Sequence, residues 1–578
     1  MKSRYLAAVL GLFLLLAACG PAATPTSAPR ATAAPTATPS PTRVAPAATA
    51  QPTATPSTAP TQAKPASGPR PGGVLKLAIN EDMPGWDPFR GGTTSTGYSI
   101  RSYIHERLLD TKDTPPACQI TPYAPALASS WNWVNDTTLQ LKLRQGVKYP
   151  NLPPVNGREF TADDVVYSVK EQWPAMPLLA APLSKVKGAE AVDKYTVNIL
   201  LKEPYSPFVD RVPGEKRTVV VAPEIYAGKK ELTLPEENVG LGPFIITSSR
   251  PGVGMTMKKN TSYFMPDRPY LDGLEIAIVP DISTVIALLR GKKLDLYQKQ
   301  GGIPIVDQMR RIPGLSSQVC PHTATIFVYM RLDLPPFNDI RVRRALSLAI
   351  DREAMLKTVY LNMGAWYYSS VTPVYPDLML KKDEYPPETR RYFEYNPTEA
   401  KRLLSEAGIA AGTEINIAAS NRTAEPVHAD GAEFLAAALS GIGLKPSLTL
   451  MDAPLFNTNV YAGGKNYKHT AIGYGAPGNT TDEFLYDNYH SQSPTRNRAH
   501  INDPVLDKLI EQSWVTTDPT KLKEIIRQHQ LRFAEQLWMV PLPQTINSVF
   551  WQANVKNVNV NAAMNDNGPW LRHVWMEQ

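Results

Sequence analysis

The chain contains few cysteines and, beyond its first 18 residues, no long hydrophobic run. Only three cysteines occur among 578 residues, at positions 19, 118 and 320, and they form no C-x-x-C motif. A membrane-spanning helix needs about 20 predominantly apolar residues, and no segment after Ala18 supplies them. The sequence therefore predicts neither a cysteine-based metal site nor a transmembrane sensor.

Blocks of like charge and catalytic motifs are missing as well. Sixty Lys and Arg residues are interspersed with 53 Asp and Glu residues, without a basic stripe, so nucleic acid is not a predicted partner. The chain has no P-loop, no G-x-S-x-G elbow and no H-E-x-x-H motif. None of its eight histidines form a pair at metal-ligand spacing within one helix. We expect no cofactor, no metal and no catalytic residue, which disfavours a secreted hydrolase.

The N-terminus has the pattern of an export signal. Lys2 and Arg4 precede an apolar run that ends at Ala18, and this run is too short to cross a bilayer. Leu16-Ala17-Ala18-Cys19 resembles a bacterial lipobox, which predicts cleavage after residue 18 and lipidation of Cys19. A lipid anchor of this kind would hold the chain on a membrane surface. The alternative is an ordinary signal peptide followed by an incidental cysteine.

Residues 19–71 are dominated by Ala, Thr, Pro and Ser and have few bulky apolar side chains. Such a segment cannot bury enough surface to offset the entropy of ordering it, so we predict a disordered tether. Its length is on the order of 40 Å as a flexible coil and about 150 Å as polyproline II.

The remaining part, from Gly72 onward, shows the alternation of strands and the periodicity of helices. Residues 73–79, 137–147, 195–201 and 271–281 alternate apolar with polar residues and are predicted strands. Helices are predicted after Thr161, Asn396 and Asp518, where capping residues precede apolar positions at helical spacing, and over residues 339–355. The arginines at 341, 343 and 344 are expected largely off the apolar face of this last helix. The fold class is α/β.

Two further side-chain questions arise in this globular part. Cys118 and Cys320 could form a disulfide across a long loop, because an exported chain lives where disulfides persist, or they could be two separate buried thiols. His529 lies on the apolar side of its predicted helix and is interpreted as a hydrogen-bonded core residue rather than a ligand.

Seven motifs follow one another along the globular part. They occupy residues 72–88, 125–149, 155–170, 238–244, 268–296, 337–355 and 395–408. In this order they resemble the landmarks of family 5 bacterial extracellular solute-binding proteins, which include dipeptide, oligopeptide and nickel receptors of ABC importers. The segment PNLPPV at 150–155 is an insertion-like departure from that pattern.

The resemblance implies a periplasmic-binding-protein-like clamshell of two lobes, type II-like, with an extra domain as in oligopeptide receptors. Lobe I would consist of residues 72–102, 239–322 and 541–578, the extra domain of 103–238, and lobe II of 323–540. A monomer would enclose a small solute between the lobes and deliver it to an ABC permease. It would be extracytoplasmic, held by its lipid on the outer face of the cytoplasmic membrane.

The resemblance also implies ligand-binding residues. Thr93 and Thr94 would lie at the mouth of the cleft, and Tyr474 and Gly475 would end a strand of lobe II. Pro477 stands where peptide-binding members carry an aspartate for the ligand's amino terminus, and a proline has neither the charge nor an N–H. Asp482, five residues further on, would need a different loop path to replace it.

Arg422 matches a position where dipeptide-binding relatives direct an arginine toward the ligand carboxylate. It could equally be a surface arginine paired with Glu425. Three ligand classes stay open on these residues: peptides, oligosaccharides, and a metal chelate or another small anion. Tyr474 and Tyr486 could stack on a ligand or belong to the core.

Overall fold

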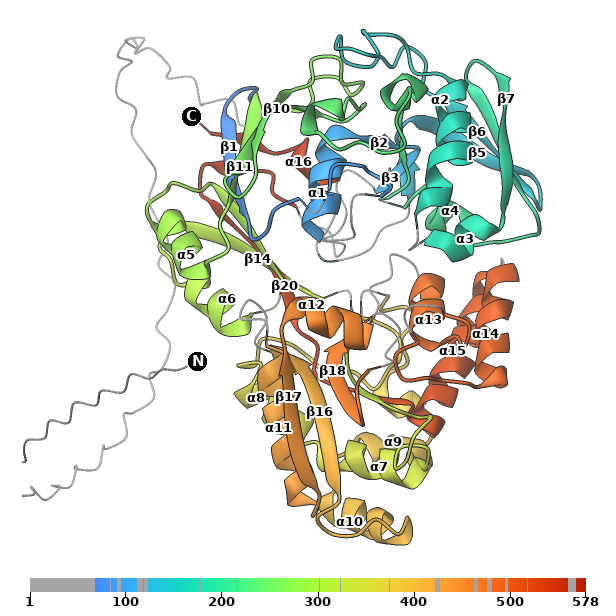
Figure 1. Cartoon of the computed structure of the whole chain (residues 1–578), viewed down its shortest axis with the longest axis vertical. Helices are drawn as coiled ribbons and strands as arrows, with labels where there is room; N and C mark the ends of the chain where they lie inside the picture. The colour runs from blue at the N-terminus through green and yellow to red at the C-terminus, as the bar shows by residue number, and fades with distance from the viewer. Residues whose placement is uncertain are drawn as a thin grey trace, which may run out of the picture. The chain divides into compact units, whose positions relative to one another are not determined.

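The computed structural model describes most of the chain beyond the predicted tether. The described residues are 68–83, 85–90, 95–111, 118, 123–176, 179–215, 217–300, 302–322, 324–373, 375–421, 427–461, 466–475, 481–493, 497–516, 518–559 and 568–577. All of them belong to one compact unit, Ser67–Gln578 (Figure 1). Within these residues no helix is both long and apolar enough to cross a membrane.

A seven-stranded mixed sheet is built around β1 (Val74–Ile79). β1 runs parallel to β12 and β13, with Val74 opposite Gly273. The strand order is β10 (Phe244–Arg250), β11 (Gly254–Lys259), β12 (Gly273–Ile278), β1, β13 (Leu296–Gln300), β20 (Ile546–Gln552) and β14 (Leu315–Pro321).

The two faces of this sheet are covered by different helices. Leu75 and Leu77 of β1 pack in one cluster with residues of α1 (Ser95–Ile104) and α16 (Gly568–Leu571). Ala78, on the opposite face, packs with α5 (Ile282–Arg290) and α6 (Ile303–Arg310). The period-2 alternation of the strand thus places successive side chains against different helix layers.

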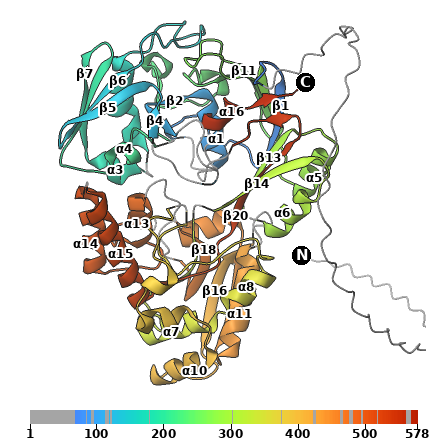
Figure 2. The ribbon, with the colours of Figure 1, turned by 180° about the vertical axis from the view of Figure 1, so that it is seen from behind.

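A five-stranded sheet forms the second core. Its order is β17 (Lys445–Met451), β16 (Glu414–Ser420), β18 (Thr470–Tyr474), β15 (Ile326–Met330) and β19 (Met539–Pro541). The helices of this part are α7 (Ile340–Ala349), α8 (Arg352–Thr358), α9 (Pro387–Arg390), α10 (Pro397–Glu406), α11 (Val427–Gly441), α12 (Ala453–Phe456), α13 (Thr481–Tyr489), α14 (Pro504–Val515) and α15 (Pro519–Gln536). Figure 2 shows α7, α8, α10 and α11 grouped beside β16.

A four-stranded antiparallel sheet lies in the segment between β4 and β9. Its order is β5 (Ala128–Asn135), β6 (Thr138–Leu143), β8 (Thr196–Leu201) and β7 (Val186–Asp193), with α2 (Ala162–Tyr167), α3 (Ala180–Ser184) and α4 (Phe208–Arg211). The short pairs are β2 (Glu106–Arg107) with β9 (Val219–Val220), β3 (Leu109–Thr111) with β4 (Tyr123–Pro125), and β21 (Val555–Lys556) with β22 (Trp575–Met576).

The chain crosses between the seven-stranded and five-stranded sheets twice, and the two crossings lie side by side. One crossing joins β14 to β15 through His322, and the other joins β19 to β20 through Thr545. The His322 N–H donates to the Thr545 carbonyl at 3.0 Å, and the Leu542 N–H donates to the Ile326 carbonyl at 2.9 Å. The two crossings therefore form a paired connection on which the sheets are joined.

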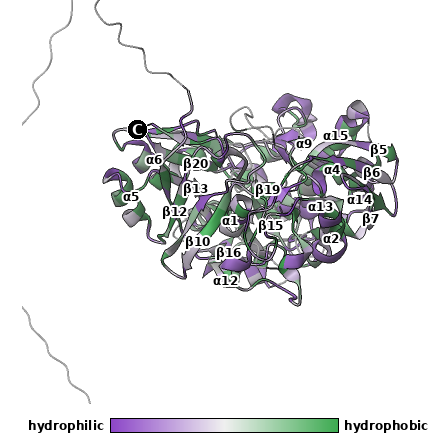
Figure 3. Cartoon of the chain, turned by 90° about the horizontal axis from the view of Figure 1, so that it is seen from above, coloured by the Kyte–Doolittle hydropathy of each residue, from purple (hydrophilic) through white to green (hydrophobic). Residues whose placement is uncertain are grey.

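The sequence-based elements agree with this structure in their positions. Leu139, Leu141 and Leu143 are buried on β6, and the Asn396 side chain accepts from the Glu399 N–H at the start of α10. Hydrophobic and hydrophilic residues mix along the helices, as Figure 3 shows, which is expected where one helix face packs inward. The helix expected over 339–355 is instead two helices, α7 and α8, because Asp351 caps a second start.

The expectation for Arg343 was wrong. Its side chain is buried, and it donates to the carbonyls of Phe337 and Gln536 at 2.9 and 3.1 Å. A guanidinium has five donors, so it can satisfy several unpaired carbonyls at once and can be buried without an acidic partner.

Cys118 and Cys320 form a disulfide, with their Cα atoms 5.1 Å apart and 202 positions separating them in sequence. The structure thus selects the paired alternative. Cys320 belongs to β14, next to the first crossing, so the disulfide ties the segment around residue 118 to the seven-stranded sheet.

The two glycines of the motif NVGLGPF, Gly240 and Gly242, pack tightly against the backbone at the end of α1. A Cβ at Gly240 would lie 2.2 Å from the Ile104 carbonyl oxygen, and one at Gly242 would lie 2.7 Å from the same atom. The Gly242 N–H donates to that carbonyl at 2.8 Å. Both glycines are therefore required by a close approach to the end of α1.

Three buried histidines make the stability of the fold dependent on pH. Burial lowers the pKa of His105 and of His322 to about 4 and that of His529 to about 3, from an ordinary value of 6.5. His529 lies among core residues, 3.3 Å from the Ser370 hydroxyl, as its position on α15 predicted.

We expect the free energy of unfolding to fall as the pH drops below about 6.5. The folded chain keeps the three imidazoles neutral, whereas the unfolded chain protonates them, so they contribute a loss of roughly 4 kcal/mol per pH unit between pH 6.5 and pH 4. Burial raises the pKa of Glu106 and of Asp210 to about 7, so these two carboxyls bind protons in the folded chain and offset about two thirds of that loss. Urea titrations from pH 7.5 to 4.5 measure this slope. His529→Gln should lower the slope by roughly 1.4 kcal/mol per pH unit, which is the contribution of one proton, and a variant with the unchanged slope would contradict the assignment.

Candidate ligand-binding site

The carboxyl ends of parallel strands mark where a ligand is expected in an open α/β sheet. β16 and β18 are parallel neighbours that end at Ser420 and Tyr474. In the seven-stranded sheet, β1 ends at Ile79 beside its parallel neighbours. The segments that carry the predicted ligand residues follow these three strand ends.

The structure describes two of the predicted site residues, Tyr474 and Gly475. The other predicted residues lie outside the described part of the chain; they are Cys19, Thr93, Thr94, Arg422 and Pro477. The structure therefore describes the predicted site at the end of β18, where Tyr474 and Gly475 are neighbours.

Tyr474 lies at the end of β18, beside the first crossing. Its ring stacks on the His322 ring at 4.6 Å between centroids, with an interplanar angle of 18°, and the His428 ring meets it edge-on at 4.7 Å. Its backbone N–H donates a hydrogen bond to the Tyr461 hydroxyl at 2.8 Å. Tyr474 is thus fixed by contacts on both its ring and its backbone.

Gly475 is held where no side chain fits. Its N–H donates to the Thr325 carbonyl at 2.7 Å. A Cβ there would lie 2.9 Å from Phe327 Cε2 and 3.0 Å from Asn488 Oδ1. The strand end therefore packs directly against the first crossing and against α13.

Arg498 is a functional candidate that the sequence-based reasoning missed. Its side chain is buried, and its Nη1 donates to the Tyr329 hydroxyl at 2.8 Å and to the Tyr474 carbonyl. The guanidinium also lies over the Tyr461 ring, 4.1 Å from the centroid. Arg498 comes from a polar turn rich in Ser, Pro and Asn, which gave no local sign of burial.

Asp482 is engaged within the protein. Its Oδ2 lies 3.2 Å from Arg211 Nη1 and 3.5 Å from the Tyr205 hydroxyl. Asp482 lies in the first turn of α13 (Thr481–Tyr489), five positions after Pro477, whereas Arg211 is the last residue of α4. The sequence analysis considered Asp482 as a replacement for the ligand-binding aspartate that is missing at position 477. In the structure this carboxylate is paired with Arg211.

A second set of contacts lies beside this ion pair. The N–H and hydroxyl of Ser206 both donate to the Trp514 carbonyl, at 2.7 and 2.6 Å. The Tyr205 and Trp514 rings meet edge-on at 6.0 Å, and Figures 1 and 2 both place α3 and α4 next to α13 and α14. The segment after the four-stranded sheet thus contacts the helices that follow β18.

Comparison with protein families identifies this architecture. The model of the bacterial extracellular solute-binding proteins, family 5 (middle part), matches residues 122–495, well over half of the chain. The chain belongs to this family. The resemblance seen in the sequence motifs is thereby confirmed, and so is its main implication that the protein is an extracytoplasmic binding receptor rather than an enzyme.

The relatives of this solute-binding protein cover most of its length. Di/tripeptide-binding protein 2 of Pseudomonas aeruginosa is 26% identical over 528 residues, covering 87% of this chain and 93% of the relative. The glutathione-binding protein GsiB of Escherichia coli is 28% identical over 437 residues, covering 72% of this chain and 79% of the relative.

A solved structure shares the fold. The periplasmic binding protein DppA of Helicobacter pylori, solved with the peptide STSA, superposes with a TM-score of 0.73 at 22% identity, covering 88% of this chain and 99% of that chain. The expectation of a two-lobed α/β fold is confirmed.

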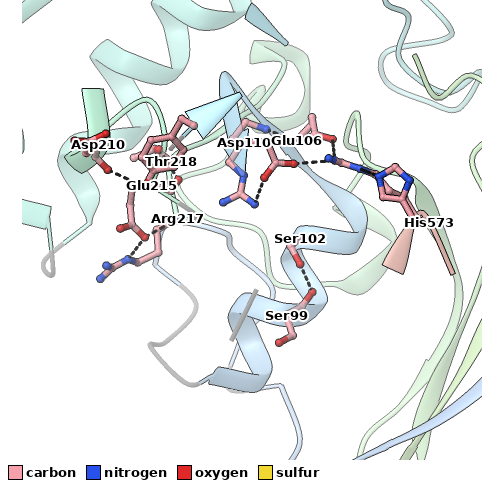
Figure 4. Close-up of polar contacts among 12 residues, drawn as sticks. Ser99, Ser102, Glu106, Asp110, Asp210, Glu215, Arg217, Thr218 and His573 are labelled. Carbon is pink, nitrogen blue, oxygen red and sulfur yellow. Dashed lines mark hydrogen bonds and ion pairs between the residues drawn. The ribbon is translucent and has the colours of Figure 1, made fainter. Parts of the chain in front are cut away.

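A buried ionic network lies away from the strand ends, among α1, β2, β3 and α16 (Figure 4). Arg572 Nη1 lies 2.8 Å from Asp110 Oδ2 and 3.7 Å from Glu106 Oε2, and Arg107 Nη2 lies 2.8 Å from Asp110 Oδ1. Burial raises the pKa of Glu106 to about 7. These opposite charges are paired with one another, so the network has a structural role in the solute-binding protein.

Metal coordination finds no support in the described residues. No group of three or more His, Cys, Asp or Glu side chains there could hold a metal ion. The rings of His322 and His428 contact Tyr474 instead. The described part of the site offers aromatic faces, backbone groups and the Arg498 guanidinium.

Proposed function

We propose that this chain is the substrate-binding lipoprotein of an ABC importer, which captures a peptide-like solute between its lobes and delivers it to a membrane permease. The observation that carries the proposal is the family match over residues 122–495. The di/tripeptide and glutathione named for the relatives indicate the size and chemistry of the solute. Thr93, Thr94, Arg422, Tyr474, Gly475 and Pro477 are the proposed ligand-binding residues.

The proposed domains follow the sheets. Lobe I consists of residues 72–102, 239–322 and 541–578, the extra domain of 103–238, and lobe II of 323–540. Every strand of the seven-stranded sheet falls within the first set, and the four-stranded sheet falls within the extra domain. Capture then means that ligand shifts the lobes toward a closed form, by an amount limited to its differential affinity for that form.

An oligosaccharide is a weaker candidate than a peptide. A sugar would need an open aromatic face on which to stack, whereas His322 already stacks on the Tyr474 ring at 4.6 Å. The proposed solute is accordingly a small peptide or a peptide-like acid.

A thermal-unfolding screen tests the proposed function. The full chain, purified in mild detergent and stripped of carried ligand by unfolding and refolding, is screened against peptide, oligosaccharide and metal-chelate pools. A ligand at about 100 times its dissociation constant should add roughly 2.7 kcal/mol and raise the midpoint of unfolding. Stabilisation by the peptide pool is expected. Stabilisation by sugars alone would overturn the peptide assignment, and no shift with any pool would oppose the receptor assignment.

The proposed anchor rests on Cys19, which follows the predicted signal of residues 1–18 and begins the tether of residues 19–71. We expect Cys19→Ser to move the protein from the membrane fraction to the soluble fraction, because the acyl chains would be lost. Fractionation followed by immunoblotting measures this, with Ser27→Ala as the control. A Cys19→Ser protein that stays with the membranes would show that another segment anchors it.

A further inference from the structure

The extra domain proposed for residues 103–238 meets the rest of the molecule at two places. Both of its chain connections, near residues 103 and 238, lead to the proposed lobe I, so the backbone does not join it directly to lobe II. Figures 1 and 2 nevertheless place its helices α3 and α4 next to α13 and α14 of lobe II, well to the side of β14 and β20. The two lobes are thus linked a second time, away from the two crossings.

The junction between the extra domain and lobe I is buried and ionic. Arg572 of lobe I lies 2.8 Å from Asp110 of the extra domain, and the two side chains are each 2% exposed. The hydroxyl of Tyr263, also in lobe I, donates to the Glu106 carboxylate at 2.9 Å. Parting these groups would leave buried charges without partners, which is strongly unfavourable. The extra domain is therefore expected to move with lobe I as one body.

The contact between the extra domain and lobe II consists of polar and aromatic groups. Arg211 Nη1 lies 3.2 Å from Asp482 Oδ2. The N–H and hydroxyl of Ser206 donate to the Trp514 carbonyl at 2.7 and 2.6 Å, and the Tyr205 ring meets the Trp514 ring edge-on. These five residues form a clasp between the extra domain and lobe II.

The clasp shares little apolar core between the two parts. In the part of the chain that the structure describes, the apolar cluster of the extra domain includes Phe89 and Leu241 of lobe I among its buried members. From lobe II the same described cluster takes only Trp514, which is partly buried. Small polar contacts of this kind are typical of domains that move relative to each other. The clasp thus has the composition of a reversible contact, whereas the junction with lobe I does not.

We infer that the clasp holds the cleft closed and so sets how long a captured solute is retained. A rotation at the crossings that opens the cleft moves Arg211, together with lobe I, away from Asp482 of lobe II. The ion pair therefore stabilises the closed form without touching the ligand, and its two members are positioning residues. The inference rests on the proposed function, to which it adds the residues that control retention. Apparent affinity then follows the fraction of chains in the closed form.

Spin labels on either side of the clasp test the inference without a ligand. Val192 in β7 and Val505 in α14 are 55% and 56% exposed, and both are replaced by cysteine for labelling. The natural cysteines do not compete, because two form the disulfide and Cys19 is the proposed acylation site. In pulsed electron paramagnetic resonance on the stripped full chain, Asp482→Asn and Arg211→Met should each shift the ratio of short to long distances about 10-fold toward long. Unchanged distances in both variants would overturn the inference.

An ion pair within lobe II provides the matched control. Asp333 pairs at 2.7 Å with Arg331, and both residues belong to lobe II. Asp333→Asn should therefore leave the distances between the labels unchanged. Unfolding curves establish that each variant folds. A shift in Asp333→Asn as large as in Asp482→Asn would mean that loss of any ion pair loosens the lobes, and it would also overturn the inference.

Dissociation rates distinguish the clasp from direct binding of the ligand by Asp482. Members of the pool of dipeptides and tripeptides are measured one at a time by stopped-flow on the stripped full chain. Asp482→Asn and Arg211→Met should each raise the dissociation rate about 10- to 100-fold and change the association rate much less. The double variant should dissociate no faster than the faster single variant, because both substitutions remove the same interaction.

The opposite sign for Arg211→Met would contradict the clasp. If Asp482 bound the ammonium of a peptide, Arg211→Met would free the carboxylate and slow dissociation, and this result would overturn the inference. Failure of the unaltered chain to bind any peptide would oppose the proposed function, whereas the distances between the spin labels would still decide whether the clasp holds the lobes together.

Discussion

Replacing Arg572 by methionine is expected to lower the free energy of unfolding by about 3–5 kcal/mol, which is the usual cost of removing one partner from a buried ion pair. Arg572 is 2% exposed, and its guanidinium lies 2.8 Å from Asp110 and 3.7 Å from Glu106. Methionine fills a similar volume but leaves the second oxygen of Asp110 without its cation. Urea unfolding at pH 7.5 measures the loss.

An exposed pair in the same protein gives the control for Arg572. Arg311 pairs with Asp307 one helical turn away, and the arginine side chain is 77% exposed. Arg311→Met should therefore change stability by less than about 0.5 kcal/mol. A loss below about 1 kcal/mol for Arg572→Met would mean that water or a neighbouring cation compensates Asp110.

Removing the disulfide should have an effect of similar size. Cys118 and Cys320 close a loop with a sequence separation of 202, for which the chain-entropy model gives about 5 kcal/mol, and measured losses are typically about 2–5 kcal/mol. We expect the double variant Cys118→Ala, Cys320→Ala to unfold at a lower urea concentration than the unaltered chain. The loss arises because the unfolded chain gains conformational freedom.

A reductant separates the disulfide from other effects of the two substitutions. Dithiothreitol should lower the unfolding midpoint of the unaltered chain and leave that of the double variant unchanged. A midpoint that is insensitive to reductant in both proteins would contradict a stabilising disulfide.

Local sequence patterns predicted the elements of this fold well. The alternation of Leu139, Leu141 and Leu143 and the cap at Asn396 depend on neighbours within a few positions, and both are present in the structure. The two crossings between the sheets have no local signature, because they depend on pairing of His322 with Thr545 far along the chain. The overall two-lobed arrangement was reached through the resemblance to a family.

The site was predictable only in part, for a similar reason. Tyr474 and Gly475 lie at a strand end, where the family resemblance placed them, whereas Asp482 is engaged by Arg211, which precedes it by 271 positions. No local pattern could reveal that partner. Arg498 looked like one more charged residue in a polar turn, and its burial follows only from packing against Tyr461 and Tyr329.

The ion pair between Arg211 and Asp482 has a consequence for the proposed peptide ligand. Asp482 forms a partly buried ion pair with Arg211. A ligand ammonium could bind the Asp482 carboxylate only by breaking this ion pair.

The most direct measurement of the central claim is a calorimetric titration of the stripped full chain with the peptide-pool member that stabilises it most, followed by recovery of the ligand. A receptor should bind one molecule per chain, reversibly, and should return the ligand chemically intact after prolonged incubation. Conversion of the ligand into products, or no saturable binding, would contradict the account of this protein as a solute-capturing receptor.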